Sequence, residues 1–369
     1  MKEIAQQALD IAVSKGALFA DVRSLESARE DLQVKDGQVG GVDRSETRGL
    51  GVRVLVRGAW GYAGTDDLSR EGIEACAARA VELGRASASL QRVPVALAPE
   101  PARRAAWSSQ CAVDPFTVPI ERKLDLLFRV DAALRAVKGV SIAEGFLTFT
   151  RKRQVYLSSE GADIDQTVTR SGGGYHAMAV NDREVQRRSF PQFEGHHQTL
   201  GYEFIDSIPW VEQATRVGEE AVALLSADPC PDGESDIILE GSQLGLQIHE
   251  SVGHPTELDR VLGMEANYAG TSFLTVDKLR KLQFGSPKVN LTADATLPHG
   301  LATFAFDDEG VEAQRWPIVK DGLFVGYLTS RELAHAVGDA RSRGCVRSDG
   351  WHHVPMIRMV NLSLEPGAG

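Results

Sequence analysis

Two histidines in one short stretch constrain the fold more than any other feature of this chain. His249 and His254 stand five residues apart, and Glu250 directly follows the first of them. Residues four apart on an α-helix lie about 40° apart around its axis, whereas residues five apart lie about 140° apart. Both rings can therefore face one point only where the helix is bent or widened. Gly253 and Pro255 flank His254, where a π-bulge or a helix end would do this.

The same three residues suit a hydrolytic metal site. Two neutral imidazoles can hold a Zn²⁺-like ion, and a carboxylate beside them can take a proton from water on that ion. The alternative is a helix with two polar surface histidines. Against it, Leu244, Ile248 and Val252 repeat at every fourth position and predict one apolar helix face. A strand-like run at 236–240 precedes the helix, and Ser242 is its expected N-cap. We therefore expect the motif on a short helix anchored in a core.

The composition describes an ordinary globular protein and excludes several classes of partner. The chain has 369 residues, of which 43% are hydrophobic and 25% charged. A net charge of −11 argues against binding nucleic acid or an anionic membrane surface, because both need clustered cations. There is no apolar run long enough for a membrane span and no signal-peptide core. Four dispersed cysteines without a CxxC pair favour a reduced, cytoplasmic location.

The periodicity of the first 228 residues predicts helices combined with consecutive hairpins. The pattern predicts helices at 4–12, 69–83, 119–139 and 210–225, and strands at 21–27, 31–35, 49–56, 60–65, 146–150, 154–158, 162–170 and 175–180. Ser69 is the expected N-cap of the second helix, and 91–110 looks like a surface connection. Successive hairpins of this kind are typical of an antiparallel meander.

The Pro- and Gly-containing segment 228–233 is the expected domain boundary. Beyond it, 302–306 and 315–327 read as strands, with turns at 307–310 and 320–322. The fold class that we expect is α+β. An N-terminal helix-plus-antiparallel-sheet domain spans 1–228, and a β-rich C-terminal domain at 233–369 carries the motif helix.

Several other polar residues near the motif or elsewhere invite a functional interpretation. Glu257 and Asp259 lie close enough in sequence to support the histidine rings by hydrogen bonds, although solvated surface carboxylates are the plainer alternative. His196 and His197 are adjacent, so they would face opposite sides of a strand, and a polar loop is expected. The acidic run 307–309 lacks the spacing of a calcium loop and is interpreted as a turn.

Taken together, these motifs resemble the TldD/PmbA family, in particular its TldD-type metallopeptidase branch. The resemblance covers nearly the whole chain and rests on four stretches: 249–254 with Glu257 and Asp259, then 306–311, 319–327 and 353–361. It implies a cytoplasmic peptidase of small or unfolded peptides, often paired with a metal-free sister subunit. By position in the motif, it implies His249 and His254 as ligands of a zinc ion and Glu250 as the catalytic base.

The resemblance also implies a third metal ligand, a cysteine in a C-terminal stretch beyond residue 369. The C-terminal domain is therefore expected to be incomplete here, and residues 1–369 alone are expected to bind metal weakly and to show little activity. Cys345 is the competing candidate for the third position, although a buried free thiol is the commoner state of such a residue.

Three functions follow as hypotheses. The first is metal-dependent hydrolysis of peptides, with Glu250 deprotonating the attacking water. The second is a non-catalytic peptide-binding or partner subunit of a TldD/PmbA-like complex. The third, a mononuclear iron oxygenase, needs a carboxylate ligand, and Glu250 points elsewhere on a helix. The expected partners are a peptide substrate and either a second copy of the chain or a PmbA/TldE-like sister subunit, with neither nucleic acid nor membrane.

Overall fold

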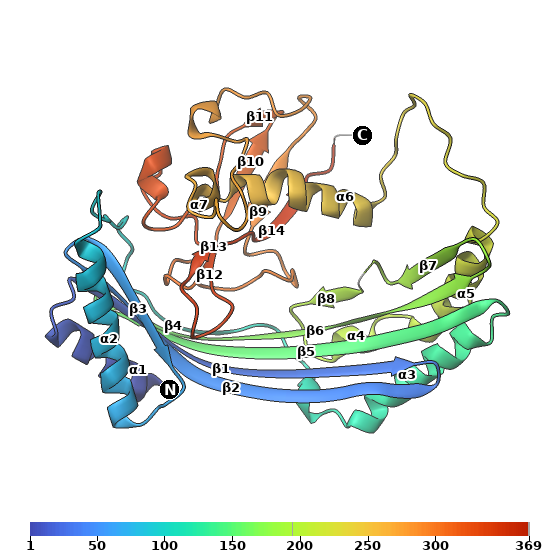
Figure 1. Cartoon of the computed structure of the whole chain (residues 1–369), viewed down its shortest axis with the longest axis horizontal. Coiled ribbons are helices and arrows are strands. Elements are labelled where there is room, and N and C mark those ends of the chain that lie inside the picture. The colour runs from blue at the N-terminus through green and yellow to red at the C-terminus, as the bar shows by residue number, and fades with distance from the viewer. Residues whose placement is uncertain (194, 368–369) are drawn as a thin grey trace.

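A large curved antiparallel sheet forms the base of the molecule. The computed structural model describes residues 1–193 and 195–367. The sheet order is β3-β2-β1-β5-β6-β4, and β7 and β8 also pair with β6. Its strands are β1 (Phe19–Lys35), β2 (Gln38–Val56), β3 (Ala59–Thr65), β4 (Arg104–Ser108), β5 (Val140–Ser158), β6 (Asp163–Val180), β7 (Val185–Phe190) and β8 (His196–Gln198). Figure 1 shows helices on its outer side and the C-terminal part of the chain over its inner, concave side.

The central strands are longer than expected, because they run through segments that the sequence marks as breaks. Residues 151–153 continue β5, since Arg151 and Arg153 form ion pairs with Asp114 and Asp165 without interrupting the ladder. The glycines at 172–174 continue β6 and are sites of close packing. A Cβ at Gly172 would lie 1.9 Å from the ring of His197. The expected separate strands are therefore parts of two continuous ones.

The helices of the N-terminal part cover the two ends of the outer face. They are α1 (Lys2–Ser14), α2 (Arg70–Ala88), α3 (Ile120–Arg135), α4 (Glu203–Asp206) and α5 (Trp210–Leu224), with a 3₁₀ turn at Pro115–Thr117. One core lies under α1 and α2, and another under α3 and α5. The Ser69 side chain accepts a hydrogen bond from Gly72 N–H at 3.1 Å, so the expected N-cap of α2 is confirmed.

The C-terminal part combines short helices with short strands around its own core. Its elements are α6 (Gly241–Ile248), a π-helical turn (His249–Gly253), a 3₁₀ turn (His254–Thr256), α7 (Leu258–Val261), β9 (Leu291–Asp294), β10 (Arg315–Lys320), β11 (Leu323–Phe324), β12 (Val346–Arg347), β13 (Met356–Ile357) and β14 (Asn361–Leu364), with 3₁₀ turns at Val276–Lys278 and Ala334–Val337. The sheets are β11-β10-β9-β14 and β12-β13. Helices and mainly antiparallel strands together make the fold α+β.

Two strands expected in this part are absent from the described residues. The run 236–240 is an irregular segment, in which Ile237 and Ile238 are 77% and 98% exposed, because no strand or core covers it. The run 302–306 forms only an isolated bridge from Phe306 to Glu312. The turn expected at 307–310 is present, but its acidic side chains are buried.

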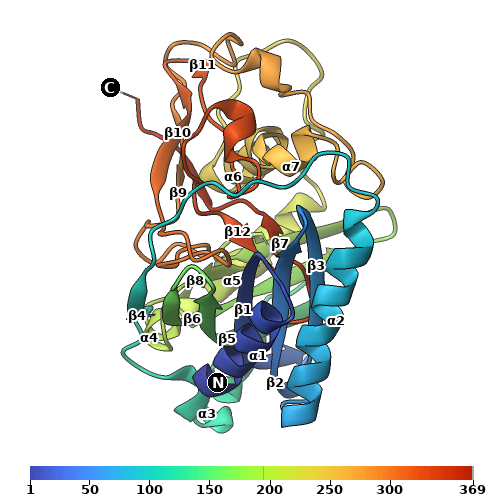
Figure 2. The same cartoon turned by 90° about the vertical axis from the view of Figure 1, so that its left-hand side faces the viewer.

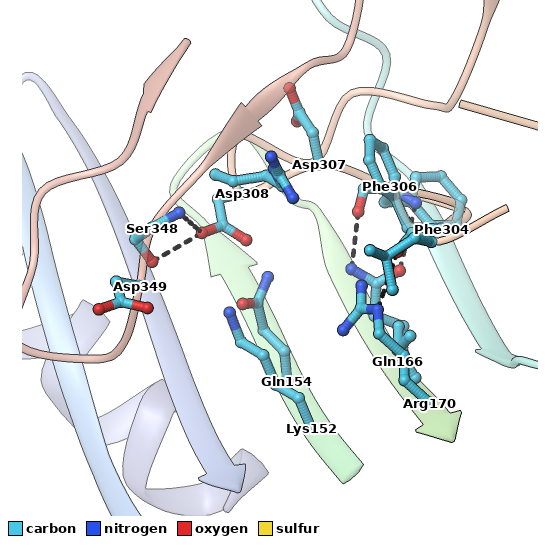
Figure 3. A pocket seen from close by; sticks show the side chains of 13 residues that line it. Lys152, Gln154, Gln166, Arg170, Phe304, Phe306, Asp307, Asp308, Ser348 and Asp349 are labelled. Atoms are coloured by element: carbon cyan, nitrogen blue, oxygen red, sulfur yellow. Dashed lines mark hydrogen bonds between the residues drawn. The ribbon is translucent and has the colours of Figure 1, made fainter. Parts of the chain in front are cut away.

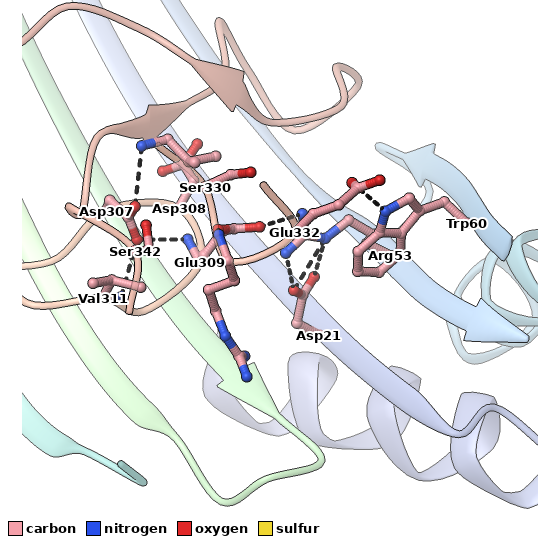
Figure 4. A network of polar contacts seen from close by, with 12 residues as sticks. Asp21, Arg53, Trp60, Asp307, Asp308, Glu309, Val311, Ser330, Glu332 and Ser342 are labelled. Atoms are coloured by element: carbon pink, nitrogen blue, oxygen red, sulfur yellow. Dashed lines mark hydrogen bonds and ion pairs between the residues drawn. The ribbon is translucent and has the colours of Figure 1, made fainter. Parts of the chain in front are cut away.

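Buried ion pairs join the C-terminal part to the sheet. Arg23 of β1 donates to Asp308 at 2.9 Å, and both side chains are nearly inaccessible. Arg53 of β2 lies between Asp21 at 2.6 Å and Glu309 at 2.9 Å (Figure 4). These contacts tie the acidic turn to the inner face of the sheet. The division into domains at 228–233 stays a prediction.

The segment 91–103, expected as a plain surface connection, crosses the C-terminal part on its way from α2 to β4 (Figure 2). The backbone of Ala98 exchanges hydrogen bonds with Arg331, and Glu100 pairs with Arg341 at 2.6 Å. The end of the expected connection, 104–108, forms β4, which pairs with β6 in parallel. This pairing joins residues far apart in sequence, so local periodicity gives little sign of it.

Candidate metal centre

The helix carrying the motif leaves α geometry at the first histidine. Residues 241–248 form α6, and 249–253 form a π-helical turn in which His254 N–H donates to the carbonyl of His249. This hydrogen bond spans five residues instead of four, so the turn holds one more residue than an α-helical turn. The distortion predicted from the five-residue spacing is confirmed.

Local chemistry explains why the helix widens and ends here. Pro255 has no N–H to continue the α-helical ladder. The hydroxyl of Thr256 instead donates to the carbonyls of Val252 and Gly253, at 2.8 and 2.9 Å. Gly253 lies against Met359, whose sulfur would be 1.8 Å from a Cβ at that position. A side chain at this position would require Met359 to move, so glycine packs best at the end of the turn.

The helix is anchored at its C-terminal end only. Val252 is buried, whereas Leu244 and Ile248 are only partly covered, so the predicted apolar face is incomplete. The N-cap is Glu240, whose carboxylate accepts a hydrogen bond from Ser242 N–H at 3.0 Å. The expected cap at Ser242 is wrong, because the helix begins two residues earlier than that cap implies.

The π-turn brings the two histidines to one point. Their Nε2 atoms lie 3.1 Å apart, and the rings meet edge to face. Two nitrogens bound to one tetrahedral zinc at about 2.1 Å lie about 3.4 Å apart, so the pair fits a shared ion with a small adjustment. Glu250 Oε1 is 3.9 Å from His249 Nε2. One nitrogen of each histidine and one carboxylate oxygen of Glu250 all lie within 4.8 Å of one another, a grouping that could hold a metal ion.

A buried carboxylate orients the second histidine. Glu257, which is inaccessible to solvent, lies 3.0 Å from His254 Nδ1. Arg260 Nη2 lies 3.1 Å from the same carboxylate oxygen and 3.3 Å from Nδ1. An anionic acceptor favours a proton on Nδ1, which leaves the Nε2 lone pair free to bind a metal. The expected contact of Glu257 with the histidine ring is confirmed.

Asp259 does not support the histidines, so that expectation is wrong. Its carboxylate accepts hydrogen bonds from the backbone N–H groups of Arg260 at 2.9 Å and Ile357 at 3.2 Å. Burial raises the pKa of Asp259 to about 6. The side chain therefore holds β13 against α7 instead of reaching the site.

Cys345 is not brought to the histidine pair, so its candidacy as third ligand is wrong. The side chain is fully buried, and its thiol donates to the carbonyl of Thr329 at 3.3 Å. Burial raises the pKa of this thiol well above its usual value, which disfavours the thiolate that binds metals.

His196 and His197 lie in the short strand β8 and not in a polar loop. His196 meets the ring of Phe204 edge-on at 5.2 Å, and His197 stacks on Phe146 at 6.3 Å. Burial lowers the pKa of both rings, which favours their neutral form. Their pairing with Gly172 and Gly173 gives them a packing role.

Sequence reasoning missed a polar cavity between the sheet and the C-terminal part. Lys152, Gln154 and Arg170 line it from β5 and β6, and Arg347 and the acidic turn close it (Figure 3). In an uninterrupted strand, Lys152 and Gln154 share one face because they are two residues apart. Because a break between strands was expected at 151–153, the sequence did not indicate that Lys152 and Gln154 lie on one face.

Three models of one family match the chain. The model of PmbA/TldA metallopeptidase domain 1 matches residues 20–84, that of the central domain matches 113–227, and that of the C-terminal domain matches 232–369. A metalloprotease of Methanothermobacter thermautotrophicus is 30% identical over 360 residues, which cover 95% of this chain and 72% of that protein. The chain therefore belongs to the PmbA/TldD family.

Other relatives carry similar names. Metalloprotease MJ0996 of Methanocaldococcus jannaschii is 28% identical over 351 residues, which cover 95% of this chain and 74% of that protein. A protein of Saccharolobus solfataricus named zinc metalloprotease TldD homolog is 28% identical over 136 residues, 37% of this chain and 28% of that protein.

Solved structures share the fold at low sequence identity. A Thermotoga maritima protein provisionally described as a modulator of a DNA gyrase has a TM-score of 0.76 at 19% identity, covering 99% of this chain and 77% of that one. TldE of Thermococcus kodakarensis has a TM-score of 0.72 at 15% identity, covering 99% and 78%. Within the described residues, every helix is too short or too polar to cross a membrane.

Proposed function

We propose that this chain is a zinc-dependent peptidase of small or unfolded peptides. The observation that carries the proposal is the meeting of His249 and His254 across the π-turn, with Nε2 atoms 3.1 Å apart and Glu250 beside them. The names of relatives support the class of enzyme but not the substrate, since several are called metalloproteases and one a zinc metalloprotease.

Each residue of the group has a role that follows from its position. His249 and His254 would hold the ion through Nε2. When bound, zinc lowers the pKa of its water toward about 7 and stabilises negative charge on the scissile carbonyl oxygen. Glu250, whose side chain is 63% exposed, takes a proton from water while the water oxygen forms a bond to the carbonyl carbon of the peptide. The same proton then passes to the leaving amine as the C–N bond breaks.

The substrate form follows from the sheet. Residues 38–49 of β2 pair with β1 on one side, whereas β3 covers the other side only from Leu50 onward. An extended peptide can add to such an edge through backbone hydrogen bonds that do not depend on sequence. Short or unfolded peptides fit this mode of binding, and compact folded proteins do not.

The proposal includes a sister subunit and a cytoplasmic location. The fold shared with TldE supports pairing with a PmbA/TldE-like chain or with a second copy. The four cysteines are free, two of them exposed, as is usual in a reducing compartment.

Cleavage of a quenched fluorescent peptide, with zinc in excess over protein, tests the proposal. We expect slow turnover that a chelator removes and excess zinc restores, because weak metal binding and little activity are predicted for residues 1–369. Glu250→Gln should lose about 10²–10⁴-fold in turnover and keep its zinc, because only the base is removed. His249→Ala should lose both. The controls are Glu219→Gln and His335→Ala, which make the same changes at exposed positions away from the motif.

A second pair of substrates tests the substrate form. The same protein should cleave a reduced, denatured protein faster than its compact folded form. Zinc-independent cleavage, or zinc loss in Glu250→Gln with retention in His249→Ala, would overturn the assignment. Peptide binding without any turnover at saturating zinc would favour the non-catalytic partner subunit instead.

A further inference from the structure

The cavity between the sheet and the C-terminal part is built as a site for a negatively charged group. It has a volume of about 310 Å³ and is lined from below by Lys152, Gln154 and Arg170. Figure 3 shows Lys152 and Gln154 side by side, reaching from β5 toward Asp308 and Ser348. Arg347, in β12, contributes a third cationic side chain to the same lining.

The two buried carboxylates that line the cavity, Asp307 and Asp308, are already hydrogen-bonded to other groups, whereas the third, Asp349, is exposed. Asp308 accepts hydrogen bonds from Arg23 at 2.9 Å and from the N–H and hydroxyl of Ser348, both at 2.8 Å. Although burial raises the pKa of Asp308, the charges of Lys152 and Arg23 bring it down to about 2. Asp307 accepts backbone N–H groups of its own turn and of Val346.

None of the three cations forms an ion pair within the described residues, although the charge of Asp308 acts on Lys152 and Arg347. Lys152 makes neither a hydrogen bond nor an ion pair there, and burial lowers its pKa. Arg170 donates to the carbonyl of Leu301 at 2.9 Å, and Arg347 to that of Met359 at 3.0 Å. Burial and then the charge of Arg347 lower the pKa of Arg170 to about 10. An anion between these cationic side chains would stabilise their charged forms and so raise the lowered pKa values of Lys152 and Arg170.

Three further atoms on two side chains point to a missing ligand. The side chain of Gln154 is 3% exposed, lines the cavity and lies beside Asp308, yet neither its amide nitrogen nor its oxygen meets the geometry of a hydrogen bond. Arg347 Nε is also buried without a partner. A buried polar group without a hydrogen bond costs about 1–3 kcal/mol, so a ligand that supplies partners here is favoured.

A second hollow adjoins the cavity and is lined by a cation that lies near Glu257. This second hollow, of about 820 Å³, shares Arg347, Ser348 and Asp349 with the cavity and extends to Arg358. Arg358 Nη1 lies 3.9 Å from Glu257, the carboxylate that contacts His254. The second hollow therefore borders both the cationic cavity and Arg358, which lies beside the carboxylate that contacts His254.

We propose that the cavity binds a carboxylate group of the peptide substrate through Lys152, Arg170 and Arg347, with the Gln154 amide as an additional donor. This inference rests on the proposed function only in taking the ligand to be a peptide. A planar carboxylate suits guanidinium donors, and the cavity has room for a chain end or for one acidic side chain.

Peptide binding, measured with a chelator present so that no cleavage occurs, tests the inference. The probes are fluorescein-labelled peptides of uncharged residues that end either in a free carboxylate or in an amide, and amidated peptides with one Glu or one Gln. Fluorescence anisotropy gives the dissociation constants. We expect one carboxylate to tighten binding by about 10-fold or more, the usual effect of a charge-assisted hydrogen bond. Which carboxylate peptide gains identifies the chain end or the acidic side chain as the group bound.

Lys152→Gln should remove this preference without unfolding the protein, because Lys152 has no hydrogen-bond partner to lose. The matched control is Arg153→Gln on the opposite face of β5, where the side chain pairs with Asp165; it should retain the preference. Equal binding of carboxylate and amide peptides by the unmodified chain would overturn the inference, as would an equal effect of both variants. These results do not depend on turnover, so failure of the proposed peptidase activity would be seen separately.

Discussion

At the scale of single residues, the buried carboxylate of Glu257 decides which nitrogen of His254 is free. His254 Nδ1 lies 3.0 Å from the Glu257 carboxylate, so Nε2, which faces His249, remains available to bind a metal. Support of this kind fixes the tautomer and the orientation of a metal-binding imidazole. Arg260 and Arg358 lie beside this carboxylate, at 3.1 and 3.9 Å.

Replacement of Glu257 should therefore weaken zinc binding without removing a ligand. We expect Glu257→Gln to lower zinc affinity by about 10–100-fold, measured by competition with a chromophoric chelator. Asp259→Asn, in the short helix α7 that follows Glu257 but without contact to the histidines, serves as the control and should change zinc affinity little. Equal losses in both variants would mean that Glu257 acts only through folding.

Asp259 itself should make stability depend on pH. Its folded pKa of about 6 lies above the usual 3.8, so the folded protein holds this proton more tightly than the unfolded chain. The resulting stability is present below pH about 4 and is lost as the pH rises through about 6. Relative to Asp259→Asn, the unmodified protein should lose up to about 3 kcal/mol of unfolding free energy over this range. Urea unfolding at several pH values gives the difference, and a pH-independent difference would contradict the account.

Much of the candidate site could be predicted from the sequence at this scale, because spacing and chemistry are local. His249, Glu250 and His254 lie together as their types and spacing predict, and Glu257 contacts His254. The partners Arg260 and Arg358 could not be found in this way, since neither spacing nor composition shows which cation faces a buried carboxylate. The candidacy of Cys345 as a metal ligand was wrong because burial decides whether a thiol loses its proton, and sequence alone does not give burial.

At the scale of elements, the π-turn is the feature on which the site depends. Gly253 ends the turn against Met359, where a Cβ would lie 1.8 Å from the sulfur. We expect Gly253→Ala to destabilise the protein by about 1–3 kcal/mol through overpacking and to weaken zinc binding. Adding Met359→Ala should restore part of both, because it removes the atom that clashes. Thermal unfolding and zinc titration provide the measurements.

Gly245 offers a matched control in the preceding helix. A Cβ there meets no atom within 4 Å, so Gly245→Ala should be neutral or stabilise by about 0.5–1 kcal/mol. If Gly253→Ala behaved like this control, the turn would not require close packing at its end.

The helices were easier to predict than the strands. Ser69, for example, caps α2 as its hydroxyl predicts, because a cap is a contact across three residues. The strands β5 and β6 run through charged and glycine-rich segments because neighbours on both sides complete their hydrogen bonds. Conversely, 236–240 has strand-like residues but no neighbouring strand, and remains irregular. Whether a segment forms a strand depends on pairing with residues distant in sequence, and the local sequence pattern does not show that pairing.

At the scale of the whole molecule, buried ion pairs hold the C-terminal part, with its histidines, over the sheet. Arg23 and Asp308 belong to different parts of the chain, and their side chains are 1% and 7% exposed. Removing one partner leaves an uncompensated buried charge. The acidic turn at 307–309 both lines the cationic cavity and pairs with arginines of the sheet. It therefore fixes the C-terminal lining of the cavity relative to the sheet.

We expect Arg23→Met to destabilise the protein by about 3–5 kcal/mol. Arg129→Met, which breaks an exposed pair with Asp125, should change stability by no more than about 0.5 kcal/mol. Guanidinium unfolding compares the two variants. Similar effects would show that the buried pair does not hold the two parts together.

The central claim is that His249 and His254 bind one zinc ion across the π-turn. Anomalous diffraction at the zinc edge, from crystals of the 369-residue chain grown with zinc in excess, tests it most directly. We predict one peak within about 2.1 Å of both Nε2 atoms, absent from crystals of His249→Ala and of His254→Ala. A peak bound elsewhere that persists in both variants, with nothing between the two rings, would contradict the account.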